Sequence, residues 1–78
     1  MKELIEYIAR SLVDDPTQVH IEQSRRGSAV YFELGVAKED MGRVIGRSGR
    51  VANSMRALLR VAAARDGRRA SLDIVDPQ

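Results

Sequence analysis

Hydrophobic and polar residues change their spacing several times along this chain, and each change marks an expected element. Near the start, apolar residues recur every three or four positions, which is the spacing of one face of a helix. These residues are Leu4, Ile5, Ile8 and Leu12. The helix is expected to end near Asp14, because Asp15 precedes Pro16 and a residue before proline is disfavoured in the helical region.

Two segments then alternate between apolar and polar residues, as half-buried strands do. The first covers residues 19–23, and the second covers residues 29–35. Between them, Gly27 can adopt the positive φ that a tight turn requires. Residues 19–34 therefore predict a β-hairpin.

Helical spacing returns at residues 37–45 and is interrupted by Gly46. A longer helix is expected to begin at about Arg50 and to end before Gly67, a residue suited to a helix C-terminus. One face of this helix is apolar and contains Val51, Met55, Leu58, Leu59 and Ala62. Arg56 and Arg60 lie opposite that face and are interpreted as solvated surface.

A last strand is expected over residues 71–75, with Leu72 and Ile74 toward the core, before Pro77. The predicted order is helix, strand, strand, helix, helix, strand. This order favours an α+β fold in which a three-stranded sheet carries three helices on one face. The 78 residues are enough for a single domain, residues 1–78.

Charge is distributed unevenly along the chain, although the net charge is only +2. Residues 1–40 contain five lysines and arginines against eight acidic residues, whereas residues 41–69 contain eight arginines and the single acid Asp66. A concentrated cationic segment is typical of a polyanion-binding surface. Arginine suits this role because its planar fork of donors matches phosphate.

The cationic segment contains a Gly-x-x-Gly turn between the two predicted helices. Glycines at Gly46 and Gly49 allow a ligand to approach the backbone closely. Amides of Arg47, Ser48 and Gly49 would face phosphate oxygens at the start of the long helix, where the helix dipole favours an anion. The candidate binding residues are Arg43, Ile45, Gly46, Arg47, Ser48, Gly49, Arg50 and Val51, with Ile45 and Val51 offering apolar surface to bases or filling core.

Other chemistries find little support in the sequence. There is no cysteine, and His20 is the only histidine, so neither a zinc site nor any other metal or cofactor site is expected. The acidic pairs at residues 14–15 and 39–40 suit a helix end and a helix start better than acid–base catalysis. No Gly-Lys-Ser/Thr follows the glycines, so the phosphate-loop pattern is absent. We therefore expect no enzyme, no small-molecule substrate and no membrane association, and we expect a cytoplasmic location.

The run from Asp40 to Arg50, with the element order around it, resembles the type II KH domain, and specifically the small bacterial single-KH proteins of the KhpA kind. This resemblance covers essentially the whole chain. It implies that single-stranded RNA is held by the Gly-x-x-Gly loop, and that the protein is an RNA chaperone or post-transcriptional regulator. It also implies a homodimer, or a heterodimer with a larger KH-domain protein of the KhpB (Jag) kind, linked to cell envelope growth and division. The alternative is a KH-fold dimerisation module with little direct RNA binding.

Overall fold

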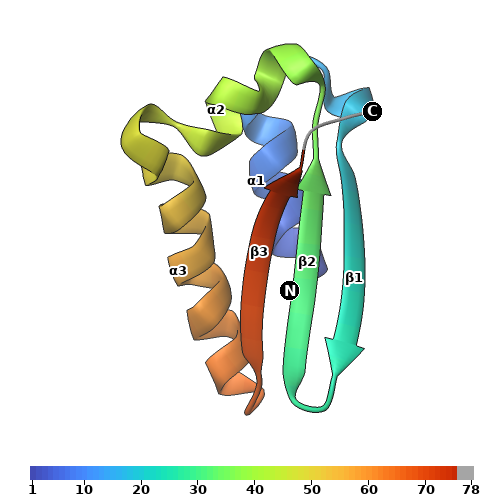
Figure 1. Ribbon diagram of the computed structural model, residues 1–78, viewed down its shortest axis with the longest axis vertical. Helices are drawn as coiled ribbons and strands as arrows, with labels where there is room; N and C mark the ends of the chain where they lie inside the picture. The colour runs from blue at the N-terminus through green and yellow to red at the C-terminus, as the bar shows by residue number, and fades with distance from the viewer. Residues whose placement is uncertain (76–78) are drawn as a thin grey trace.

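The computed structural model describes residues 1–75 and has the element order that the sequence predicts (Figure 1). Pro77, expected just after the last strand, lies outside the described residues. The helices and strands are α1 (Lys2–Leu12), β1 (His20–Arg26), β2 (Ala29–Gly35), α2 (Met41–Ile45), α3 (Arg50–Arg65) and β3 (Arg69–Val75). Three short 3-10 turns join them, at Pro16–Gln18, Lys38–Asp40 and Arg47–Gly49.

The three strands form one mixed sheet in the order β1-β2-β3. β1 and β2 are antiparallel neighbours joined by the expected turn, in which Gly27 has a φ of 61°. β2 and β3 run parallel, so α2 and α3 form the crossover that connects them. The α+β fold with a three-stranded sheet and three helices is confirmed.

The core lies between the helices and one face of the sheet. Alternate residues of β2 are buried, which confirms the apolar face expected there: Val30, Phe32 and Leu34. They pack with buried residues of the helices and of β3, including Ile5, Ala9, Met55, Leu59 and Leu72. Alternate residues of β2 and β3 on the other face are exposed, so a single apolar layer holds the domain together.

Several boundaries differ from the sequence-based expectation. α1 ends at Leu12 rather than near Asp14. The first strand was expected over residues 19–23, but β1 begins at His20 and continues to Arg26, and only Ile21 in it is partly buried. Alternation was a weak guide here because most of this strand packs against no helix. Its length is set by pairing with β2.

Two side chains of α3 also differ from expectation. Leu58 lies on the apolar side of the helix, but half of it is exposed (50%). Arg56 was interpreted as solvated surface, but it is half-buried: its Nε donates to the Leu72 carbonyl oxygen of β3 at 3.0 Å. Its Nη1 also donates to Asn53 Oδ1 at 3.0 Å. Arg56 therefore joins the helix to the neighbouring edge of the sheet.

Candidate nucleic-acid interface

The Gly-x-x-Gly turn is a tight backbone reversal between α2 and α3. Gly46 has φ 77° and ψ 172°, a combination that only glycine adopts readily. A Cβ on Gly46 would lie 2.5 Å from Val51 Cγ2 and 2.9 Å from the Val51 amide nitrogen. This glycine therefore serves two needs at once, because it permits the backbone turn and lets the end of α2 close against the start of α3.

The second half of the turn is left-handed. Gly49 has a φ of 75°, and Ser48 before it has φ 58° and ψ 25°. Left-handed backbone costs a non-glycine residue about 1–2 kcal/mol, so Ser48 is held in a mildly strained conformation. A Cβ on Gly49 would meet nothing closer than 3.8 Å, at the Asn53 side chain. Conformation alone, and not space, favours glycine at this second position.

Two amides of the turn have no acceptor within residues 1–75, those of Arg47 and Ser48. The amide of Gly49, expected to face phosphate as well, already donates to the Gly46 carbonyl oxygen at 3.1 Å. The amide of Arg50 donates to the Arg47 carbonyl oxygen. The loop therefore offers an anion two unsatisfied donors ahead of a 16-residue helix, whose N-terminus carries partial positive charge.

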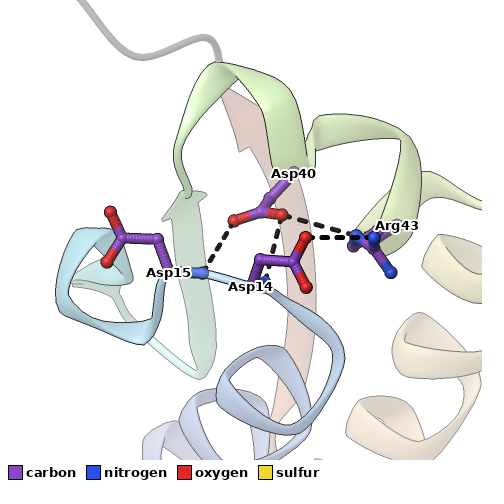
Figure 2. A network of polar contacts seen from close by, with 4 residues as sticks. All are labelled: Asp14, Asp15, Asp40 and Arg43. Carbon is purple, nitrogen blue, oxygen red and sulfur yellow. Dashed lines mark hydrogen bonds and ion pairs between the residues drawn. The ribbon is translucent and has the colours of Figure 1, made fainter.

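The arginines around the loop divide into two kinds. Arg47 and Arg50 are exposed, and neither forms an ion pair within the described part of the chain. Arg43, by contrast, is engaged: its Nη2 lies 3.1 Å from Asp14 Oδ2 and its Nε lies 3.5 Å from Asp40 Oδ1. Figure 2 shows Arg43 reaching from α2 to both carboxylates. An anion at this position would compete with two existing ion pairs, whereas Arg47 and Arg50 can respond to it at once.

Asp40 is the buried acid behind this arrangement, with only 2% of its surface exposed. Its two oxygens accept hydrogen bonds from the amides of Asp14 and Asp15, each at 3.1 Å (Figure 2). The sequence placed Asp40 at a helix start, and it does precede α2 directly. Its contacts with the chain that follows α1 were missed, because no local pattern links residues some 26 positions apart. Asp40 thus ties α1 to the helix pair that carries the loop.

The two apolar residues that flank the turn are separated by the fold. Ile45 is 37% exposed at the end of α2. Val51 is half-buried against the core and lines a shallow apolar hollow between α1 and α3. The other residues that line it are Ile8, Leu12, Arg50, Ser54, Met55 and Leu58. Apolar surface next to the loop is therefore present, but Ile45 and Val51 do not share one pocket.

A second hollow lies between α3 and β3. Arg60, Arg68 and Arg69 line it together with Ala64 and Ala70. Arg60 had been interpreted as solvated surface, and the sequence left open what Arg68 and Arg69 do. The structure brings all three cations into one place, on the face of α3 that Arg56 joins to the sheet. Three guanidinium groups around one hollow extend the positive field beyond the loop.

Within residues 1–75, no group of three or more histidine, cysteine, aspartate or glutamate side chains is arranged to hold a metal ion. No helix in the same range is long and apolar enough to cross a bilayer.

A mixed three-stranded sheet, a helix pair joined by a Gly-x-x-Gly turn and a third helix on the same layer define a KH domain. Comparison with known families agrees with this class. The family model described as "KhpA/KhpB, KH domain" matches residues 2–74. The chain belongs to this family.

Curated relatives match over almost the full length of both chains. The RNA-binding protein KhpA of Halalkalibacterium halodurans is 43% identical over 76 residues, which cover 97% of this chain and all of the relative. The RNA-binding protein KhpA of Clostridium perfringens is 41% identical over 75 residues, covering 96% of this chain and all of the relative. The protein of the same name from Chlamydia trachomatis is 41% identical, with 97% of each chain covered.

Proposed function

We propose that this chain binds single-stranded RNA, and that the Gly-x-x-Gly loop holds the sugar-phosphate backbone. One observation carries the proposal: the unsatisfied amides of Arg47 and Ser48 stand at the start of α3 beside two exposed guanidinium groups with no carboxylate partner in residues 1–75. Backbone donors and arginine forks are the groups that bind phosphate oxygens. The names of the relatives, which are RNA-binding proteins, support the same ligand.

Each residue has a distinct part in this proposal. Gly46 and Gly49 let the strand approach, Arg47 and Arg50 pair with phosphates, and the Ser48 hydroxyl donates a hydrogen bond. Arg43 stays with its carboxylates until the strand arrives, and Ile45 and Val51 offer apolar surface to bases. Tyr7 and Tyr31 are the only exposed aromatics among the described residues. Neither belongs to the loop, so base stacking contributes little and sequence preference is loose.

Binding is expected to depend strongly on salt. If three or four phosphates are neutralised, the logarithm of the association constant falls with the logarithm of salt concentration with a slope of about −2 to −3 on single strands. Fluorescence anisotropy of labelled RNA oligonucleotides, measured from low to moderate ionic strength, gives this slope directly. A folded sample with no measurable affinity at low ionic strength would contradict the proposal. A flat salt dependence would show that phosphate contacts do not supply the affinity.

We further propose that the protein works in the cytoplasm as an RNA chaperone or post-transcriptional regulator, together with a larger KH-domain protein of the KhpB (Jag) kind, in cell envelope growth and division. The specific observation behind a protein partner is the exposed apolar surface of α3 and α1: Leu58 is 50%, Val61 57% and Tyr7 73% exposed. Partners that join two RNA-binding domains raise affinity through effective concentration. Size-exclusion chromatography with light scattering, alone and with the KhpB-type protein, is expected to show a mixed complex. Two separate peaks at high concentration would contradict this partnership.

The alternative function is a KH-fold interaction module that binds little RNA. The same exposed apolar surface favours it. The two functions separate at the loop, because a module that only binds proteins does not need the charge and open amides of Arg47 and Ser48. The loop variant described in the Discussion therefore decides between them.

A further inference from the structure

β1 forms an outer edge of the sheet that no described element covers. It pairs only with β2, and in Figure 1 nothing among residues 1–75 lies beyond it on that side. All of its residues except Ile21 are exposed. The strand is seven residues long, and its register with β2 is continuous, without a bulge. An edge of this kind presents a row of unpaired backbone N–H and C=O groups, on which another strand can pair.

The order of side chains along β1 is self-complementary. On the open face of the sheet β1 carries Glu22, Ser24 and Arg26 in succession. Two copies that meet edge to edge, antiparallel about a two-fold axis, can place Ser24 opposite its own copy. Glu22 then lies opposite Arg26 of the partner subunit, and by symmetry this ion pair occurs twice. Each directly opposite charge pair contributes about 0.2–1 kcal/mol.

Neighbouring registers lack this match, since a strand must shift in steps that keep each side chain on its face. Centring the axis on Gln23 places Glu22 opposite a serine. Centring it on Glu22 or on Arg25 places like charges directly opposite each other, which is destabilising. Charges on an edge strand usually prevent pairing. Here their order permits one register and excludes the others.

The rest of the open face supports the same register. Glu22, Glu33 and Asp73 lie side by side across the three strands, on the exposed face. Three carboxylates in one row repel each other within a single copy. In the chosen register this row continues directly into a row of the partner subunit that contains its Arg26 and its Arg69. The partner therefore supplies the cations that the acidic row lacks.

We propose that this chain forms a two-fold dimer in which β1 of each copy pairs antiparallel, joining the two sheets into one of six strands. The assembly closes at two copies, because the free edge of β3 lies beside α3 and Arg56 already donates to its Leu72 carbonyl oxygen. This proposal goes beyond RNA binding and does not depend on it. It leaves both loops accessible, since the α2–α3 turn and β1 lie on opposite sides of the molecule (Figure 1).

Charge exchange tests the dimer and its register together. Sedimentation velocity at low ionic strength, over a wide concentration range, compares the chain with Glu22→Arg, with Arg26→Glu and with the double variant. Each single change should weaken self-association about tenfold, because two ion pairs become two repulsive pairs, and the double variant should restore it. All four are measured with Leu58→Asp also present, so that the apolar surface of α3 does not contribute. A chain that stays monomeric in this background, or a double variant as weak as the single ones, would overturn the proposal.

Because the chain has no cysteine, a single introduced thiol reports the register directly. Ser24→Cys places two thiols opposite each other at the axis, where Cα atoms of paired strands lie about 4.5–5.5 Å apart and a disulfide can form. Ser71→Cys is the matched control, an exposed serine on the same face but on β3. We expect mild oxidation to cross-link the residue-24 variant at least tenfold faster than the residue-71 variant. Equal rates would contradict pairing through β1, and circular dichroism of both variants checks the fold.

Discussion

Replacing Arg47 and Ser48 by aspartate should lower the affinity for single-stranded RNA tenfold or more while the fold persists. The double substitution removes one guanidinium and one hydroxyl and adds two negative charges beside the two open amides. Phosphate then meets repulsion at the position where it should be bound. Both side chains are exposed, so their loss removes no core contact. Fluorescence anisotropy with labelled oligonucleotides measures the affinity, and circular dichroism confirms the fold.

A matched control separates the loop from a general loss of positive charge. Arg25→Asp together with Ser28→Asp changes the same two residue types at exposed positions of the β1–β2 hairpin, which lies away from the loop (Figure 1). This control should lower affinity by no more than about threefold, through long-range electrostatics alone. If the loop variant binds RNA as tightly as the original chain, the interaction-module alternative is favoured. If both variants lose affinity equally, the loop has no special role.

Gly46→Ala is expected to destabilise the domain by about 3 kcal/mol or more, or to prevent folding altogether. The backbone at Gly46 lies in a region that costs other residues about 1–3 kcal/mol. The added Cβ also meets Val51 at 2.5 Å, including its backbone nitrogen at 2.9 Å, so a rotamer change does not relieve the overlap. A domain of this size has little stability to spare. Urea denaturation followed by circular dichroism measures the change.

Gly42→Ala is the natural comparison, because Gly42 lies within α2 and a Cβ there meets no atom within 4 Å. Alanine favours the helix over glycine by about 1 kcal/mol, so this variant should be as stable as the original chain or slightly more stable. Opposite effects of the same substitution four residues apart would show that the turn, and not helix propensity, requires Gly46. Similar stabilities of the two variants would contradict the close approach of Val51.

The relation between sequence and structure differs between local and long-range features. Spacing of apolar residues predicted all three strands, the long helix and its start at Arg50, because burial on one face leaves a period of two or 3.6 in the sequence. The paired glycines and the charge bias of residues 41–69 located the candidate loop, since both are properties of adjacent residues. The roles of individual loop residues in binding stay predictions, to be tested by the variants above.

What the sequence by itself determined was therefore the order of elements, the fold class and the place of the Gly-x-x-Gly turn. Only the tertiary structure decided which neighbour each side chain meets. Asp40 binds amides that lie more than twenty positions away, and Arg56 reaches a carbonyl of β3. β1 proved to be a largely uncovered edge, although its sequence alternates like that of a half-buried strand. The physical reason is that periodicity reports which side of an element is apolar, whereas contacts between distant segments leave no trace in local spacing.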